Sequence, residues 1–390
     1  MLDLSQYREK NKSEIVEAEI NWTSRQEKII NDAILLEEDS FIVEGGPGTG
    51  KTLIAIEVAK RLAKRDIVLH LMYNVPLSQY IEQRTVLPQI NNVTVLTYHK
   101  WIYRFLKDYS INVPNVEGAS PYDVDWDRIE YLLDNSNVGT IYDIVITDET
   151  QDFPIGLLRI LHKLSERMIC FIDPNQSYEK DKTSLDELKT ILDVKDIFHL
   201  TDGYRTTRQI MDASNIFKTN KESTHNSEKR GSYPKMICCN SSSDAFLAQN
   251  QKIISLIKKN PNKDIGIIVN AHNMGPLKHE LDNYSIEYTS FKGGEGYSDK
   301  FLDFSKKGVK LVSFGTMKGL SFDIVIIPNV EWIKSKGDRL KDKNLLYVAM
   351  TRASEELFLL YQSVDSDNLK WTRAAREIER NKVLFDWEEC

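Results

Sequence analysis

The sequence predicts an α/β fold with two doubly wound parallel sheets, and three observations support this fold class. Short apolar runs alternate with helical patterns almost from end to end of the 390 residues. Most of these runs are continuously apolar, which is typical of strands buried on both faces of a parallel sheet. About twelve strand candidates are present, and one sheet rarely holds so many. We therefore expect two domains, 1–200 and 201–390.

The expected elements follow the chain in order. The strands of the first set are 40–45, 66–73, 93–99, 142–149 and 168–174. The strands of the second set are 197–202, 234–240, 264–270, 286–291, 309–314, 323–329 and 357–362. Helical patterns cover 51–64, 155–167, 207–216, 242–259 and 341–353. The polar stretch 218–234 predicts a loop, the domain boundary lies near 195–205, and 366–390 predicts one amphipathic, charged helix.

Composition restricts the class of protein. The net charge of −7 gives no support for nucleic-acid binding across the whole surface, although a local groove can still bind a strand. There is no apolar run of membrane-spanning length, and the charged N-terminus does not resemble a signal peptide. The four cysteines have no paired spacing, so neither a zinc site nor a disulfide framework is indicated. These features favour a cytoplasmic protein.

A glycine-rich segment, GGPGTGKT, lies between an apolar strand and a helix. This is the context of a phosphate-binding loop, in which backbone N–H groups and the helix N-terminus face phosphate oxygens. Lys51 would reach the β- and γ-phosphates, and the Thr52 hydroxyl would bind Mg²⁺. The alternative, a coincidental glycine turn, does not explain the full pattern. The loop residues expected around ATP are Gly46, Pro47, Gly48, Thr49 and Gly50.

The segment YDIVITDETQD delivers two carboxylates at the end of a predicted strand. Asp148 would hold Mg²⁺, and Glu149 would orient and deprotonate the attacking water. Adjacent carboxylates are compatible with a bound divalent cation, because the cation offsets their repulsion. Hydrolysis also needs a positively charged side chain that stabilises the γ-phosphoryl group, and the first half of the chain has no further obvious arginine for that task.

The ordered motifs resemble those of superfamily 1 helicases of the UvrD/RecB type. DETQD and FIDPNQSY are similar to motifs II and III, YNVPLSQY to motif Ia, and TYHKW to motif Ib. DGYRTTRQI, VSFGTMKGLSFDIVII and LLYVAMTRASEELFL resemble motifs IV, V and VI. The match runs from about residue 22 to residue 362. The resemblance implies two RecA-like domains with ATP and Mg²⁺ in the cleft between them.

The resemblance also implies roles for individual residues. Gln26 would read adenine, and Tyr204 would stack on the base. Gln176 would sense the γ-phosphate, while Arg205 and Arg352 would reach it from the second domain when the domains close. Gly319, in motif V, belongs to the same expected site. One departure is Ser321, where the family usually has an acidic residue.

The same resemblance places a track for single-stranded nucleic acid, usually DNA, across both domains. Aromatic side chains would stack on bases, and basic or hydroxyl groups would hold phosphates. For Trp101 and Tyr98, packing of a helix against the sheet is an equal alternative. The expected track residues are Tyr73, Asn74, Thr97, Tyr98, His99, Trp101, Thr316 and Lys318.

Two functions remain open from the sequence. The first is a DNA-dependent ATPase that acts as a minimal helicase or single-strand translocase, moving 3′ to 5′ in DNA repair, recombination or phage defence. The second is an ATP-switch subunit that senses nucleic acid and controls a partner such as a nuclease. Short spacings between motifs Ib and II, and between IV and V, motivate the second, since the large insertions of full-length relatives are missing there. A small-molecule kinase would not explain the later motifs.

Overall fold

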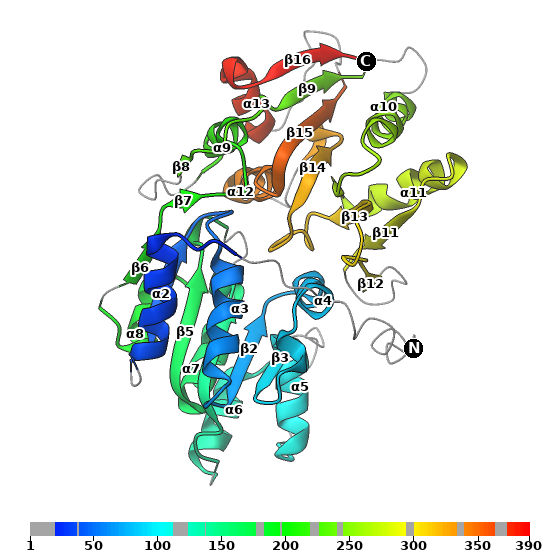
Figure 1. The fold of residues 1–390 in the computed structure, drawn as a ribbon. Coiled ribbons are helices and arrows are strands. Elements are labelled where there is room, and N and C mark those ends of the chain that lie inside the picture. The colour runs from blue at the N-terminus through cyan, green and yellow to red at the C-terminus, as the bar shows by residue number, and fades with distance from the viewer. Residues whose placement is uncertain are drawn as a thin grey trace.

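A computed structural model describes residues 20–36, 39–111, 124–136, 138–176, 183–195, 197–218, 226–239, 245–293, 300–333, 339–362 and 373–390. These residues form two α/β domains, one above the other in Figure 1. Each domain has one main sheet with helices on both faces, so the predicted fold class is confirmed. No helix within the described ranges is long and apolar enough to cross a membrane.

The sheet of the first domain has six strands, all parallel, in the order β3-β2-β4-β5-β1-β6. The runs predicted in the first half form strands because their apolar side chains are buried on both faces. The strands are β1 (Phe41–Gly45), β2 (Val68–Met72), β3 (Val93–Thr97), β4 (Tyr142–Asp148), β5 (Ser165–Ile172) and β6 (Ile197–Leu200).

Helices cover both faces of this sheet. One face packs on α2 (Ser24–Leu35), α3 (Lys51–Leu62), α4 (Val75–Arg84) and the short helix η1 (Leu87–Gln89). The other face packs on α5 (Tyr98–Asp108), α6 (Trp126–Asp134), α7 (Ile155–Lys163) and α8 (Leu185–Leu192). Two 3-10 turns, η2 (Thr150–Asp152) and η3 (Pro174–Gln176), follow β4 and β5 and carry site residues.

The main sheet of the second domain has eight strands in the order β12-β11-β13-β10-β14-β15-β9-β16. All neighbours are parallel except β11 and β12. The strands are β9 (Lys235–Cys238), β10 (Ile265–Val269), β11 (Tyr288–Phe291), β12 (Lys300–Phe301), β13 (Val309–Ser313), β14 (Phe322–Ile327), β15 (Ala353–Tyr361) and β16 (Asp386–Glu389). A separate pair joins β7 (Asp202–Gly203) to β8 (Asn226–Ser227).

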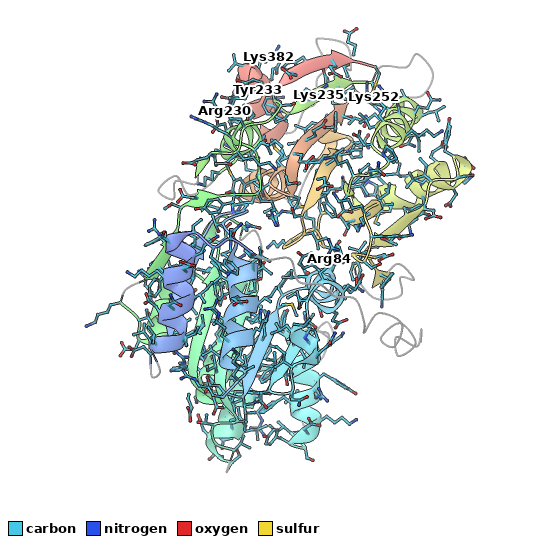
Figure 2. All side chains as sticks on the ribbon, in the orientation of Figure 1. Arg84, Arg230, Tyr233, Lys235, Lys252 and Lys382 are labelled. Carbon is cyan, nitrogen blue, oxygen red and sulfur yellow. A yellow bond between two sulfur atoms is a disulfide. The ribbon has the colours of Figure 1, made fainter. Side chains whose placement is uncertain are left out.

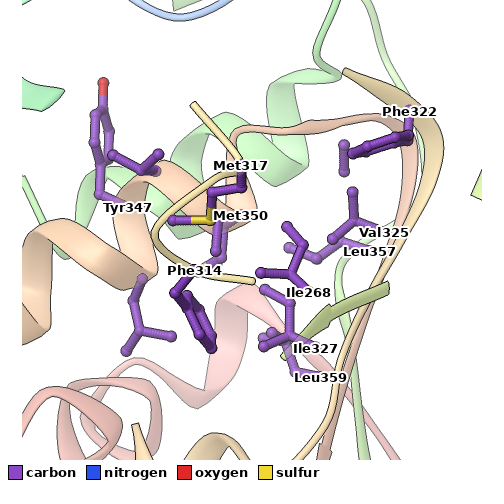
Figure 3. Packing of buried hydrophobic residues seen from close by; sticks show 14 of the residues in the cluster. Ile268, Phe314, Met317, Phe322, Val325, Ile327, Tyr347, Met350, Leu357 and Leu359 are labelled. Atoms are coloured by element: carbon purple, nitrogen blue, oxygen red, sulfur yellow. The ribbon is translucent and has the colours of Figure 1, made fainter. Parts of the chain in front are cut away.

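The helices of the second domain also divide between two faces. One face packs on α10 (Ala245–Lys259) and α11 (Met274–Asn283), with η4 (Ala271–Asn273) just before α11. The other packs on α9 (Arg208–Asn215), α12 (Arg339–Met350) and α13 (Arg373–Arg380). In this second core, Phe314 and Met317 of the segment after β13 pack with Met350 and with side chains of β10, β14 and β15 (Figure 3). The short helices η5 (Val330–Trp332) and η6 (Lys382–Leu384) follow β14 and α13.

Two expectations about chain segments are wrong. The run 197–202 was assigned to the second set of strands, but β6 pairs with β1 in the first sheet. The single C-terminal helix is replaced, within the described residues, by α13, η6 and the edge strand β16, which pairs with β9. Backbone pairing at a sheet edge determines β16, and a charged DWEE segment shows no strand period of its own. The predicted loop 218–234 lies partly outside the described residues.

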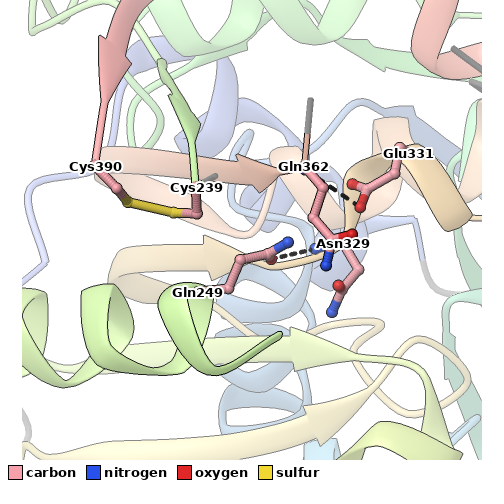
Figure 4. Close-up of a disulfide and its surroundings, with 6 residues drawn as sticks. All are labelled: Cys239, Gln249, Asn329, Glu331, Gln362 and Cys390. Atoms are coloured by element: carbon pink, nitrogen blue, oxygen red, sulfur yellow. Dashed lines mark hydrogen bonds between the residues drawn. A yellow bond between two sulfur atoms is a disulfide. The ribbon is translucent and has the colours of Figure 1, made fainter. Parts of the chain in front are cut away.

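The cysteine expectation also needs correction. Cys239, just after β9, and the terminal Cys390, just after β16, form a disulfide (Figure 4). Sequence spacing could not indicate it, because 151 residues separate the two cysteines. The bond ties the edge strand β16 to its neighbour. Cys170 and Cys238 are buried free thiols, and burial raises the pKa of Cys170 to about 12.

Candidate nucleotide site between the two domains

The strand order of the first sheet brings three segments together. The glycine-rich loop follows β1, Asp148 and Glu149 lie at the end of β4, and Asp173 follows β5. These strands are neighbours in the order β4-β5-β1. Because all three are parallel, their carboxyl ends meet at one edge, where ligands of such sheets bind.

Two glycines and Gln26 shape the loop. Gly48 and Gly50 have φ values of 73° and 94°, a region that favours glycine. A Cβ atom on Gly50 would lie 2.7 Å from Gln26 Nε2. The Gln26 amide donates to Thr49 O at 2.9 Å and accepts from Thr23 N at 3.1 Å. Gln26 therefore ties the start of α2 to the loop, in addition to lining the space where a base would lie.

Lys51 is buried at the start of α3. Its amino group donates to Gly45 O at 2.6 Å and to Gly46 O at 3.0 Å, and it lies 3.9 Å from Asp173 Oδ2. The ammonium is thus held inside the curve of the loop. Phosphate oxygens are acceptors of higher charge than these carbonyls, so a lysine in this place can bind them.

The two predicted magnesium ligands touch each other. Thr52 Oγ1 donates to Asp148 Oδ2 at 2.6 Å, and Glu149 N donates to Asp148 Oδ1 at 3.0 Å. Burial, followed by the charge of Glu149, raises the pKa of Asp148 to about 6. One hydroxyl and one carboxylate beside a phosphate loop match the small protein ligand set of Mg²⁺ at nucleotide sites. The residues therefore fit the cation that the motifs imply.

Glu149 is held by its own backbone and by Gln151. It has a left-handed backbone, with φ of 57°, which is uncommon for a residue with a side chain. Gln151 Nε2 donates to Glu149 Oε2 at 2.5 Å, and Asp173 N donates to Gln151 Oε1 at 3.0 Å. The carboxylate is buried beside the pocket, with its orientation set by these contacts.

The second domain contributes Arg352 directly. Its Nη2 atom donates to Gln176 Oε1 at 3.1 Å, across the domain boundary. Further bonds to Val348 O at 2.9 Å, Leu320 O at 3.2 Å and Thr351 Oγ1 at 3.2 Å fix the guanidinium in its own domain. Gln176 Nε2 in turn donates to Asp173 Oδ2 at 2.7 Å. A chain of hydrogen bonds therefore runs from Arg352 of the second domain through Gln176 to Asp173 of the first domain.

Arg205 lies on the same pocket but makes fewer contacts. Its Nε atom is buried without a hydrogen-bond partner among the described residues. Burial, followed by the charge of Arg352, lowers the pKa of Arg205 to about 10. Tyr204, half exposed, is positioned by a bond from its N–H to Gly48 O at 3.1 Å. A guanidinium with a buried, unpartnered Nε atom at the wall of a pocket is a group that can stabilise an anion.

These residues surround one pocket of about 390 Å³. The predicted nucleotide residues all line it except Thr49 and Asp148, which are buried just behind its wall. The lining residues that were predicted are Gln26, Gly46, Pro47, Gly48, Gly50, Lys51, Thr52, Glu149, Gln176, Tyr204, Arg205, Gly319 and Arg352. The remaining lining residues are Ile20, Asn21, Trp22, Thr23 and Leu53.

Sequence reasoning missed four residues of this region. Trp22 lines the pocket near Gln26, and an aromatic residue just before the helix was the available signal. Gln151 and Asp173 lie inside quoted motifs, but only the structure shows that they hold Glu149 and Gln176. Tyr347 is buried near Asp173 and Arg352, and burial raises its pKa well above the ordinary value.

Most residues of the predicted nucleic-acid track are buried or packed against other side chains. Trp101 is 2% exposed and donates to the Tyr142 hydroxyl at 3.1 Å, which supports the packing alternative. Tyr98 is buried too and lies 6.1 Å from the Tyr73 ring in a stacked arrangement. The half-buried His99 stacks obliquely on Tyr98 at 3.8 Å.

The polar residues of the predicted track also form contacts within the protein. Asn74 accepts from Leu77 N at 2.9 Å and donates to Lys318 O at 2.9 Å. Thr97 and Thr316 are buried, and Thr316 bonds with Ser313. Lys318 is buried in an ion pair with Asp152 at 2.5 Å. In this conformation the Lys318 ammonium faces a carboxylate of the first domain, and its phosphate contact stays a prediction.

Two family models of helicase domains match parts of the chain. A family model described as the Schlafen group 3 DNA/RNA helicase domain matches residues 38–236, just over half of the chain. A model described as the UvrD-like helicase C-terminal domain matches residues 312–360. No curated protein matches the chain.

Among solved structures, the chain is similar to the C-terminal domain of a possible DNA helicase from Lactobacillus plantarum WCFS1. The identity is 21%, over 47% of this chain and 98% of that chain, with a TM-score of 0.35. On the two family models, the resemblance to UvrD-like helicases is confirmed, and the chain belongs to the Schlafen group 3 DNA/RNA helicase-domain family.

Proposed function

We propose that the chain hydrolyses ATP in the pocket between its domains and couples hydrolysis to movement along single-stranded nucleic acid. The observation that carries this proposal is the bond between Arg352 of the second domain and Gln176 of the first. The bond lies in the same pocket as Lys51 and Glu149. A site assembled from two domains makes hydrolysis depend on their relative position, which is what a motor requires.

The residues have separate tasks in this proposal. Lys51 and the loop N–H groups bind the β- and γ-phosphates, and Glu149 accepts the proton of the attacking water. Arg205 and Arg352 place positive charge where negative charge develops on the γ-phosphoryl oxygens. Thr52 and Asp148 would hold Mg²⁺, which supplies charge neutralisation for the phosphates when bound.

The base of the nucleotide would lie between Gln26 and two aromatic residues, Trp22 and Tyr204. Tyr204 is exposed enough to move onto a base, and Trp22 is half-buried. The Gln26 amide already has two protein partners, so only its remaining donor and acceptor positions can serve the base. We therefore expect a preference for adenine that is modest rather than absolute.

The proposed polymer is single-stranded DNA, and the proposed direction is 3′ to 5′, as the family resemblance suggests. A role in DNA repair, recombination or phage defence is proposed on the same ground. Polarity is tested with partial duplexes that carry a 3′ or a 5′ single-stranded tail. Displacement from the 5′-tailed substrate alone would reverse the proposed direction.

A nucleotide switch that controls a partner such as a nuclease is the second candidate. The burial of Lys318, Trp101 and Thr97 favours it, because these side chains do not present a track for a strand in this conformation. The switch would bind and hydrolyse ATP and change domain contacts without processive movement. Failure to displace a strand, together with stable co-purification of a partner, would favour the switch over the motor.

The deciding experiment is ATP turnover measured with and without single-stranded DNA, single-stranded RNA and duplex, at fixed salt. The motor predicts a strong increase in turnover with a single strand and little increase with blunt duplex. ATP turnover that is unchanged by every polymer would contradict the motor, and the nucleotide switch would then be the remaining candidate. No turnover under any condition, with ATP bound, would contradict both.

A further inference from the structure

The 3-10 turn η2 lies between the proposed catalytic base and the second domain. It begins directly after Glu149, and Gln151 within it holds the Glu149 carboxylate at 2.5 Å. The other end of the Gln151 amide accepts from Asp173 N at 3.0 Å. Gln151 is buried, so its amide has little freedom to turn away. The direction of the Glu149 carboxylate therefore depends on where this turn places Gln151.

The last residue of the turn contacts the second domain. Asp152 Oδ1 accepts from Lys318 Nζ at 2.5 Å, and both side chains are buried. The Lys318 ammonium also lies 5.6 Å from the centre of the Tyr73 ring, and Lys318 O accepts from Asn74. Removing one member of a buried ion pair leaves the other charge uncompensated, so each partner constrains the position of the other.

The other end of the turn is fixed in the first sheet. Thr150 Oγ1 donates to Phe171 O at 2.8 Å and lies 3.2 Å from Thr147 O, so it is fixed at the ends of β5 and β4. Asp152 N donates to Glu149 O at 2.9 Å and closes the turn. Because Thr150 fixes one end of the turn and Lys318 contacts the other, the position of Asp152 also constrains that of Gln151, which lies between them.

We propose that Lys318 is a positioning residue for hydrolysis: through Asp152 and Gln151 it sets the direction of the Glu149 carboxylate. This inference rests on the proposed function and adds a second contact to the one made by Arg352. The second domain then acts on both the charge at the γ-phosphate and the base that activates water. Hydrolysis is favoured only when both contacts are made.

The alternative role of Lys318, a nucleic-acid phosphate contact, predicts different measurements. Loss of a phosphate contact weakens polymer binding and lowers its salt dependence by about one charge. Loss of a positioning contact lowers kcat, and leaves both nucleotide affinity and the salt dependence of polymer binding unchanged. The two roles are therefore separated by which quantity changes.

The experiment compares Lys318→Met, Asp152→Asn, the double variant and Gln151→Met in the full chain. Turnover is measured at saturating ATP and single-stranded DNA, and ADP affinity and thermal unfolding are measured alongside. We expect kcat to fall by between about tenfold and a hundredfold in each variant, with ADP affinity kept. The double variant should lose no more than the worse single variant, because both substitutions remove one contact.

The matched control is Lys310→Met. Lys310 is also a buried lysine of the second domain, paired with Asp264, but it lies away from the pocket. Its kcat should stay within twofold of the wild type. If a single variant unfolds, the double variant carries the test, since it leaves no uncompensated buried charge.

Three outcomes would overturn the inference. Wild-type kcat in the double variant, with Glu149→Gln inactive, would remove the positioning role and leave the proposed function standing. A lower salt dependence of DNA binding with unchanged kcat would instead assign Lys318 to the polymer. Full turnover in Glu149→Gln, or no turnover in the wild type, would remove the proposed function itself and this inference with it.

Discussion

Glu149 is the residue on which the proposed chemistry depends most directly. Glu149→Gln keeps the size of the side chain and an oxygen for the Gln151 amide, but it cannot take a proton. We expect kcat to fall by about 10²- to 10⁴-fold, with ATP still bound. The check is single-turnover hydrolysis beside equilibrium binding of ATP. Lys51→Ala is the contrast, because it should weaken ATP binding itself, and equal ATP affinity in the two variants would contradict the separate roles.

The two arginines should respond in opposite ways when stability is measured. Arg205 has a buried Nε without a partner, whereas Arg352 makes bonds to Val348, Leu320 and Gln176. Arg205→Met should therefore keep or raise the unfolding temperature, while Arg352→Met should lower it. Both should lose about 10³-fold or more in kcat. Thermal unfolding beside ATP turnover checks this, and a clear drop in the stability of Arg205→Met would contradict it.

His70 gives a prediction for pH. It is buried in β2 with both ring nitrogens unpartnered among the described residues, and burial lowers its pKa from 6.5 to about 4. Between those pH values the unfolded chain binds the proton and the folded chain does not, so stability is present above pH 6.5 and falls as pH falls. By pH 5 the loss from this group is about 2 kcal/mol.

The measurement is urea unfolding at pH 7.5 and pH 5. His70→Leu removes the titrating group and fills similar space, so its loss of stability between the two pH values should be smaller by about 2 kcal/mol. Carboxylates contribute equally to the loss of stability of the wild type and of His70→Leu. The difference between the two losses therefore reports on His70 alone. An equal loss in both proteins would show that His70 is not the cause.

The positions of site residues could be predicted from the sequence where a short motif contains them. Lys51, Thr52 and Glu149 line one pocket, because strand ends and a glycine loop determine their positions locally, and their roles stay predictions. The ion pair of Lys318 could not be predicted, because a lysine beside a glycine gives no sign of a carboxylate that lies 166 residues earlier in the chain. Burial is a property of the assembled domains.

At the scale of elements, buried strands were the most predictable feature. The runs that became β1, β2, β4 and β10 are apolar on both faces, so their position in a covered sheet follows from composition. The sheet to which a run belongs was less predictable, as β6 shows. The edge strand β16 was missed, since its side chains are mostly exposed and its backbone pairs with β9.

The disulfide beside β16 gives the prediction for this element. Cys239 and Cys390 are paired, and Cys170 and Cys238 are free. Alkylation of the unfolded, unreduced protein should therefore label two cysteines, and alkylation after reduction should label four, as read by mass spectrometry. Four labels without reduction would contradict the bond. Cys390→Ser should lower the stability of the oxidised protein by about 2–4 kcal/mol, and should have no such effect under reductant.

At the scale of the whole molecule, α4 joins the two domains on one side of the pocket. The amides of Gln79 and Gln83 pair with the backbone of 300–304 much as a neighbouring strand would. Gln79 donates to Lys300 O at 2.7 Å and accepts from Leu302 N at 3.0 Å. Gln83 donates to Leu302 O at 2.8 Å and accepts from Phe304 N at 2.7 Å. Arg84, which ends this helix, lies close to the boundary between the domains (Figure 2).

Because of these contacts, we expect α4 to be the fixed side when the two domains move relative to each other. The double variant Gln79→Ala with Gln83→Ala removes four hydrogen bonds, worth about 2–4 kcal/mol in total once water replaces them. We expect the domains to separate more often, which lowers kcat because Arg352 leaves the pocket and Lys318 leaves Asp152 at the same time. Nucleotide binding to the first domain should persist. Small-angle scattering should show a larger radius of gyration, whereas Glu82→Ala, on the exposed side of α4, should match the wild type. Unchanged scattering and unchanged turnover in the double variant would place the fixed side elsewhere, with the ion pair of Lys318 and Asp152 as the next contact to remove.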